Sequence, residues 1–326
     1  MDRIAYIVLV ALAGVAQGAC KPSSSSSSSG AGAPGAPPPA AQRPAITTAA
    51  AGQDPTGADA PTGSIGHNGL RPEVYQANLV AIGQAARVAI ASAGRASPEL
   101  GRIADPLLSA YAVSCAVPEA TVTSPSPHAG YVDPAGLLRS TAGWATGGLD
   151  ARAEADLHAC LATRLNPSGA DVEILLSGSQ VNADRLDHRD YRLEEALWIG
   201  VERPPAPSAP PGAPRSYDLA VFPSPTLVAA CGDPIAAPNA PDRSAAVKAA
   251  LTSRVCGRGG ACGLVVRDRA ECAGPGVWTC PLTSGGASVP AIETHLRCRD
   301  WCAVYPGCLV PPACADTADT RCPAAP

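Results

Sequence analysis

The stretch that decides the fold of this chain is residues 150–176, DARAEADLHACLATRLNPSGADVEILL, because its apolar pattern changes period in the middle. Asp150 is a suitable N-cap, and residues 151–165 repeat their apolar side chains at helical spacing. A turn signal, NPSG, follows at residues 166–169. Residues 172–176 then alternate as a strand does. The segment therefore predicts a helix that turns back into a strand.

Upstream of this stretch the sequence predicts further helices. Residues 72–94 have helical spacing, with Pro72 in the first turn. Ser97-Pro98-Glu99 is a second start signal, and Asp105-Pro106 is a third. In the helix that Asp105 opens, one apolar face carries Leu108, Tyr111, Ala112 and Cys115.

Downstream of it, short strands are expected. The candidates are residues 195–201, 216–222 and 262–267. Residues 203–214, RPPAPSAPPGAP, form a Pro-rich loop, since proline cannot donate to a sheet. Helices first and short strands later predict an α+β fold: an N-terminal helical layer packed on a small antiparallel sheet, followed by a disulfide-stapled C-terminal segment. We expect an α+β domain at residues 64–255 and a Cys-rich region at residues 256–326.

Cysteine usage points to an oxidising compartment. The chain has 13 cysteines, and nine of them lie between Cys256 and Cys322. Their spacing lacks the paired CxxC knuckles of zinc sites, so disulfides are the better explanation. Cys115 and Cys160 each lie on an apolar helix face, far in sequence from the C-terminal cysteines. We predict that these two form a disulfide with each other.

The N-terminus has the form of an export signal. Residues 1–19 contain an apolar run that is too short to span a membrane. The run ends in Gly18-Ala19-Cys20, which resembles the lipobox of bacterial lipoproteins, although Gln17 stands where that motif prefers an aliphatic residue. Ordinary cleavage after Gly18 is the alternative. We expect lipidation of Cys20, which also leaves an even number of cysteines for pairing.

A flexible tether follows at residues 20–63, because its Ser, Gly, Ala and Pro residues cannot bury a core. A spacer directly after Cys20 suits a chain that is fixed to a bilayer. These features predict an exported protein that is lipid-anchored in the bacterial cell envelope, at the outer membrane. With 24 basic and 28 acidic residues the chain lacks the basic excess of nucleic-acid-binding proteins.

Catalytic signatures are absent from the sequence. It contains no GxSxG, HExxH, Walker loop or GxGxxG after a strand. The richest polar run is residues 184–195, which could hold a divalent cation. Because its acids alternate with Arg185, Arg189 and Arg192, we expect a solvated loop in which those arginines neutralise them. For His158, within a predicted helix, we expect a solvated or capping role. No catalytic, cofactor-binding or metal-binding residue is assigned.

Several motifs together resemble one group of proteins. They are His67–Leu70 (HNGL), Val113–Glu119 (VSCAVPE), His158–Asn166 (HACLATRLN), Tyr191–Ala196 (YRLEEA) and the later Cys231. They resemble a group of exported proteins and lipoproteins from myxobacteria, in which helices reading VSCALP and ACLLARxN precede strands, an REGAF-like segment and a Cys-rich tail. This chain lacks the glycine of REGAF. The resemblance covers residues 64 to about 310 and implies an architecture and a location, but no activity.

The sequence thus predicts a cell-envelope lipoprotein that serves as a non-catalytic surface binding or structural module. Its partners would be the membrane, through the lipid, and a protein or glycan. The alternative is an envelope hydrolase whose site leaves no local signature. Converging carboxylates or a histidine in a buried cleft would favour the hydrolase, and a broad exposed Tyr/Trp patch would favour the binding module.

Overall fold

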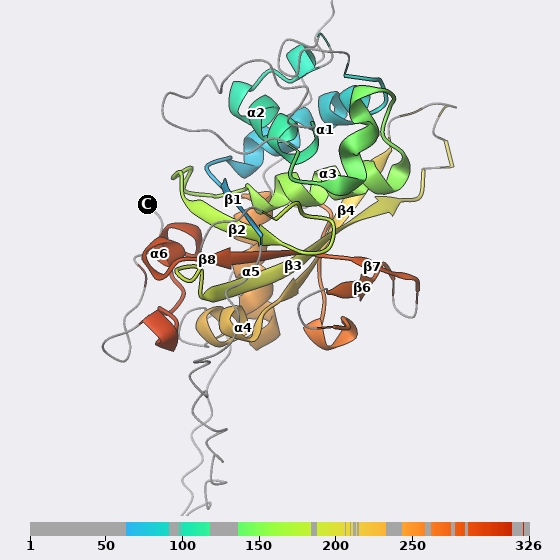
Figure 1. The fold of residues 1–326 in the computed structure, drawn as a ribbon. Coiled ribbons are helices and arrows are strands. Elements are labelled where there is room, and N and C mark those ends of the chain that lie inside the picture. The colour runs from blue at the N-terminus through green and yellow to red at the C-terminus, as the bar shows by residue number, and fades with distance from the viewer. Residues whose placement is uncertain are drawn as a thin grey trace, which may run out of the picture. The chain divides into compact units, whose positions relative to one another are not determined.

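A six-stranded sheet lies at the centre of the described structure, with strand order β1-β2-β8-β3-β4-β5 (Figure 1). The computed structural model describes residues 63–90, 98, 100–117, 136–183, 188–205, 207–208, 210, 213, 215–232, 243–257, 262–274, 278–283, 286–314 and 322. The signal segment, Cys20 and the tether lie outside these residues, as do Ser97 and Glu99 of the second helix start.

The sheet is mixed. Its strands are β1 (Ser64–His67), β2 (Glu173–Ser177), β3 (Leu193–Arg203), β4 (Ser216–Pro223), β5 (Leu264–Val266) and β8 (Ile292–Leu296). All neighbours pair antiparallel except β4 and β5, which are parallel. A separate two-stranded hairpin consists of β6 (Thr279–Pro281) and β7 (Ser288–Pro290). The predicted α+β class is therefore confirmed.

Helices cover one face of the sheet. They are α1 (Pro72–Ala86), α2 (Pro106–Ala116), α3 (Ala151–Thr163), α4 (Pro225–Cys231), α5 (Arg243–Cys256) and the short α6 (Trp301–Val304). As predicted, the carboxylate of Asp105 accepts from Leu108 N at 2.9 Å and that of Asp150 accepts from Ala153 N at 2.8 Å. Helix α1 ends earlier than expected, at Ala86. Figure 1 shows α1–α3 together beside the sheet, and none of the described helices is long and apolar enough to cross a membrane.

Strand β3 carries apolar side chains on both faces. Trp198 belongs to the main core beneath the helices, whereas Leu197 and Ile199 belong to a smaller core beneath the hairpin β6–β7. A strand buried on both sides reads as a continuous apolar run rather than an alternating one. The hairpin thus gives the sheet a second covered face, over β3 and β4.

Disulfides join all twelve described cysteines. Cys115 is bonded to Cys160, the predicted pair, with their Cα atoms 6.0 Å apart. The others are Cys231–Cys308, Cys256–Cys262, Cys272–Cys280, Cys298–Cys314 and Cys302–Cys322. The Cys-rich region is also part of the sheet, because it supplies the edge strand β5 and the inner strand β8, which lies between β2 and β3.

Candidate functional site

A pocket of about 520 Å³ lies at the carboxyl ends of the parallel strands β4 and β5. This volume falls within the range of small-molecule sites. We call it the α4–α5 pocket. Its lining residues are Pro223, Pro225, Val228, Arg243, Ser244, Val247, Val266, Arg267, Asp268 and Arg269.

The chain topology explains why a hollow forms here. Strand β4 ends at Pro223, and the hydroxyl of Ser224 caps α4 by accepting from Leu227 N at 3.1 Å. Helices α4 and α5 then carry the chain back, so that β5 can pair parallel to β4, with Val221 opposite Val266. Such a crossover leaves a crevice beyond the carboxyl ends of the strands, where open sheets with parallel strands bind their ligands.

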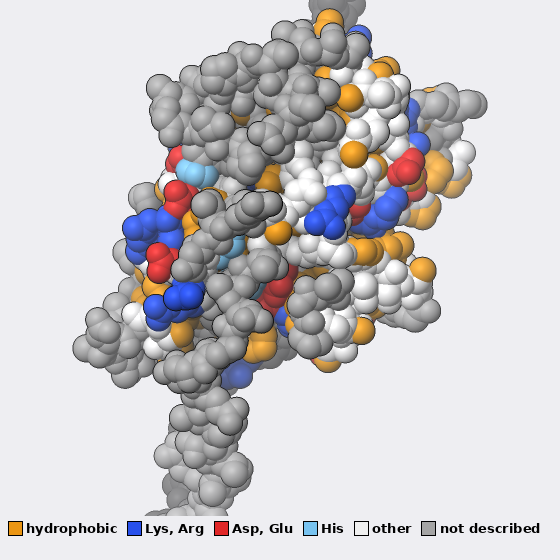
Figure 2. Space-filling model, in the orientation of Figure 1, with side chains coloured by type: hydrophobic (Ala, Val, Ile, Leu, Met, Phe, Trp, Pro, Cys, Tyr) orange, Lys and Arg blue, Asp and Glu red, His pale blue; other side chains and the backbone are white. Residues whose placement is uncertain are grey.

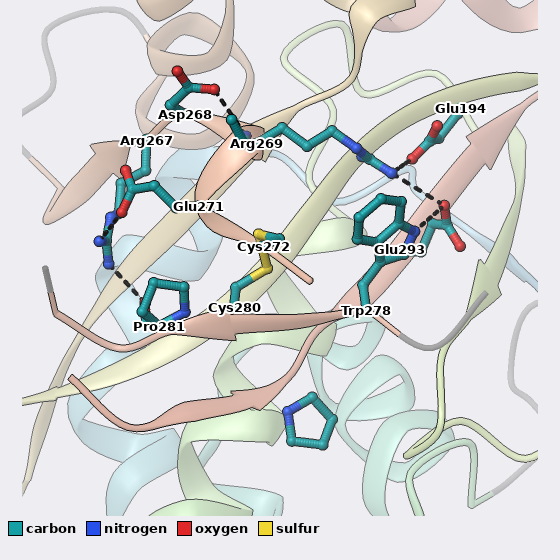
Figure 3. Close-up of a disulfide and its surroundings, with 12 residues drawn as sticks. Glu194, Arg267, Asp268, Arg269, Glu271, Cys272, Trp278, Cys280, Pro281 and Glu293 are labelled. Carbon is teal, nitrogen blue, oxygen red and sulfur yellow. Dashed lines mark hydrogen bonds and ion pairs between the residues drawn. A yellow bond between two sulfur atoms is a disulfide. The ribbon is translucent and has the colours of Figure 1, made fainter. Parts of the chain in front are cut away.

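Arg267 and Arg269 form one wall of the pocket, and their side chains extend in opposite directions (Figure 3). The Arg267 guanidinium pairs with Glu271, donates to Pro281 O at 2.7 Å, and lies 5.4 Å from the ring centre of Phe222. The Glu271 carboxylate therefore compensates the charge of Arg267.

Arg269 reaches over the hairpin face of the sheet. Its guanidinium contacts Glu194, lies 3.6 Å from the Glu293 carboxylate and stacks 4.2 Å from the ring centre of Trp278 (Figure 3). These contacts tie the short 3₁₀ turn at Arg269–Glu271 to strands β3 and β8 and to the start of β6. The wall of the pocket is thus anchored to the sheet.

Glu293 is the centre of what we call the carboxyl cluster. Its carboxylate accepts from the Ser177 hydroxyl at 3.0 Å and from the Trp278 indole N–H at 3.2 Å, and His295 Nε2 lies 3.6 Å away. The cluster consists of Ser177, Glu194, Arg269, Trp278, Glu293 and His295.

The two glutamates of the cluster have opposite pKa shifts. Burial, reinforced by the hydrogen bond and the charge of Glu293, raises the pKa of Glu194 to about 8, although Arg269 opposes this. For Glu293, burial opposes ionisation, but hydrogen bonds with His295 and Glu194 outweigh it and hold the pKa below its usual range. At neutral pH Glu194 therefore keeps its proton and Glu293 is ionised.

Arg243 is the lining arginine for which the described residues supply no counter-charge. It is the first residue of α5 and is exposed, and it forms no ion pair or hydrogen bond with another described residue. Asp268 is the acidic lining residue. Its carboxylate accepts from Ala270 N at 2.9 Å and so caps the turn that follows.

The acidic run of the sequence is described only in part, and its two glutamates differ from expectation. Residues 184–187 lie outside the described structure, and His188 is buried against Tyr191. The glutamates beyond them contact arginines from distant segments: Glu194 contacts Arg269, and Glu195 pairs with Arg254. Among the described residues, no three His, Cys, Asp or Glu side chains gather as metal ligands.

His158 corrects another expectation, because it is neither solvated nor a cap. It is 3 % exposed, hydrogen-bonds the Tyr75 hydroxyl at 2.7 Å, and stacks on Tyr217 with ring centres 4.8 Å apart. Burial lowers the pKa of His158 to about 4, so it is neutral at ordinary pH. The helix that carries it packs directly on β3 and β4, which explains its burial.

Charged surface groups of both signs are interspersed. Figure 2 shows basic, acidic and histidine side chains side by side at the edge of the molecule near β8 and α6. His67 lies 2.8 Å from Asp171 there, and Arg297 pairs with Glu173 and Asp300. The described side chains at this edge therefore carry charges of both signs rather than a uniformly positive or negative surface.

Sequence reasoning did not find the α4–α5 pocket or the carboxyl cluster. The pocket needs Val228, Arg243 and Arg269 to meet across a crossover, and no local motif marks them. In comparisons with known proteins, no family model, curated protein or solved structure matches the chain.

Proposed function

We propose that this protein is a tethered binding module of the cell envelope that takes up a small ligand in the α4–α5 pocket. The pocket at the carboxyl ends of β4 and β5 is the observation that carries the proposal. Its walls are mainly apolar, with a few polar groups at fixed positions, as in small-molecule sites generally.

A small ligand is favoured over a flat glycan or protein surface because the aromatic side chains that the structure describes are not presented outward. Trp144, Trp198 and Trp301 are each at most 1 % exposed, and Trp278 lies under Arg269 in the carboxyl cluster. No described tyrosine is fully exposed either. An aromatic platform for stacking sugars would need such side chains at the surface.

The tether and the location belong to the same proposal. A disulfide-rich fold suits an exported protein, since such bonds persist in oxidising compartments. Lipidation of Cys20 would hold the module at the membrane, with residues 20–63 as the spacer and the outer membrane as the site of attachment. The pocket would then sample ligands close to the bilayer.

A pocket-filling substitution tests the binding function. Val228 lies half-buried in the pocket wall, so Val228→Phe should fill the hollow with little effect on the core. Val80→Phe is the matched control, because Val80 is 61 % exposed on α1. Phenylbutanol, a neutral apolar probe, should bind the wild type and Val80→Phe in calorimetric titration, and Val228→Phe should lose binding by about tenfold or more. Equal binding by all three proteins would refute a site in this pocket.

The carboxyl cluster supports a second candidate, an acid–base hydrolase, because it holds a protonated and an ionised carboxyl side by side. Against it, Ser177 and Trp278 already donate to Glu293, and Arg269 pairs with Glu194. Turnover of ester, glycoside, peptide or peptidoglycan substrates by the purified chain, abolished by Glu293→Gln, would establish the hydrolase. We assign the cluster a structural role, that of holding the pocket wall on the sheet.

A further inference from the structure

We propose that the ligand of the α4–α5 pocket is a small amphiphilic monoanion, whose charged group pairs with Arg243 and whose apolar body lies against Pro225, Val228 and Val247. This inference rests on the proposed function and adds the chemical class of the ligand. The character of the pocket walls, the balance of charge among the described residues around them and the position of Arg243 support this ligand class.

The walls select an apolar body. Five of the ten lining residues are proline or valine, and they come from three separate elements: the end of β4 with the start of α4, the first turns of α5, and the end of β5. A ligand in contact with all three would bury apolar surface on several sides. Each buried methylene contributes about 0.8 kcal/mol, so the apolar body would supply most of the affinity.

Among the described residues, the balance of charge leaves the Arg243 guanidinium available to a ligand. Arg267 is paired with Glu271, and Arg269 is paired with the carboxyl cluster (Figure 3). Both guanidiniums therefore have partners. Arg243 has none among the described residues, and its five N–H donors suit a carboxylate or phosphate monoester.

Asp268 limits the charge of the ligand. Its carboxylate lies in the same lining and is held in place by Ala270 N. A second negative charge on the ligand would meet this carboxylate, which disfavours dianions. A cationic ligand would instead pair with the Asp268 carboxylate. Replacing Asp268 therefore distinguishes an anionic ligand from a cationic one.

The experiment uses three probes with one apolar body: phenylbutanoate, phenylbutanol and phenylbutylamine. Their affinities are measured by calorimetric titration on the full chain carrying Cys20→Ser, which removes the proposed lipid and the need for detergent. We expect the anion to bind about tenfold more tightly than the amine, with the alcohol between them. Because Arg243 is exposed, the preference should shrink as salt is raised.

Two matched substitutions locate the charge. Arg243→Met should lower the affinity for phenylbutanoate by about five- to tenfold and leave phenylbutanol unchanged. Arg102→Met removes the same charge from an exposed arginine outside the pocket and should change neither affinity. Asp268→Asn should raise the affinity for the anion by about two- to fivefold.

The outcomes separate this inference from the function on which it rests. Equal binding of the anion and the alcohol, tightest binding of the amine, or equal effects of Arg243→Met and Arg102→Met would overturn the anion assignment. If Val228→Phe still abolished phenylbutanol binding in those cases, the pocket function would stand. If none of the three probes showed binding sensitive to Val228→Phe, the pocket function itself would be overturned. Far-UV circular dichroism and thermal unfolding of each variant show whether it is folded.

Discussion

Glu194 and Glu195 are neighbours in β3, yet their carboxylates lie on opposite faces of the sheet. Glu194 contacts Arg269 beneath the hairpin, and Glu195 contacts Arg254 in the main core. Successive side chains of a strand point to opposite faces, and this separates the two carboxylates. The register adds a bulge after them, because Glu194 is opposite His295 and Ala196 is opposite Thr294, which leaves Glu195 as the extra residue. The alternation of the strand therefore brings two adjacent acids to two different arginines, and the bulge leaves Glu195 and Ala196 both on the side of the main core.

The first prediction concerns Glu195 and Arg254, whose side chains are 0 % exposed with Oε1 and Nε 2.8 Å apart. Glu195→Gln leaves the Arg254 charge buried without its counter-charge and should lower the free energy of unfolding by about 3–5 kcal/mol. The double variant Glu195→Gln with Arg254→Met should lose less than the sum of the two single losses. Urea unfolding of the four proteins gives this coupling.

The control for that experiment is the exposed pair Arg203–Asp218, whose side chains are 51 % and 28 % exposed. Water screens this pair, so Asp218→Asn should change the free energy of unfolding by less than about 1 kcal/mol. Comparable losses from Asp218→Asn and Glu195→Gln would contradict the argument from burial.

The second prediction is a pH dependence that comes from Glu194. The unfolded chain ionises this carboxyl near its ordinary pKa of 4.5, whereas the native state keeps the proton until about pH 8. Rising pH therefore favours the unfolded state across that window, and Glu194 lowers native stability progressively between those two pH values.

The side chain introduced by Glu194→Gln cannot ionise. The variant should therefore not lose native stability in this way as the pH rises. Relative to the wild type, its free energy of unfolding should gain about 3–4 kcal/mol between about pH 5 and about pH 8. Glu202→Gln, at a carboxylate that is 45 % exposed, is the control and should leave the pH slope unchanged. Parallel stability curves for the wild type and Glu194→Gln would show that the proton is not held as described.

The third prediction ranks two disulfides. Cys115–Cys160 closes a separation of 45 residues, and Cys256–Cys262 closes one of 6. In the chain-entropy relation these loops stabilise by about 4 and about 2 kcal/mol, respectively. The double alanine variant of the first pair should therefore lose more stability in urea than that of the second. The opposite ranking would mean that loop entropy does not govern these bonds.

The fourth prediction is acylation of Cys20. Mass spectrometry of the mature N-terminus should find a lipid-modified cysteine as the first residue, and Cys20→Ser should release the protein from the membrane fraction. A mature chain that begins at Ala19 with an unmodified Cys20 would contradict it.

The sequence alone determined the elements whose signals are local. Caps at Asp105 and Asp150 define where α2 and α3 begin, and apolar spacing puts Cys115 and Cys160 on buried faces that meet as a disulfide. The parity of the cysteines predicts complete pairing once Cys20 is set aside, and the structure pairs all twelve that it describes. The caps and the apolar spacing depend on residues close in sequence, and the pairing depends on the number of cysteines. A single sequence is therefore enough to predict them.

Tertiary structure alone decided the sheet order and the candidate site. β8 is a five-residue strand whose place between β2 and β3 depends on pairing with segments about 100 residues away, which no local pattern encodes. The bulge at Glu195, the partners Arg254 and Arg269, and the pocket beside Arg243 all follow from that pairing and from the parallel β4–β5 crossover. Charge compensation is a long-range property, because a buried carboxylate is satisfied by whichever arginine the fold brings to it rather than by its neighbours in the chain.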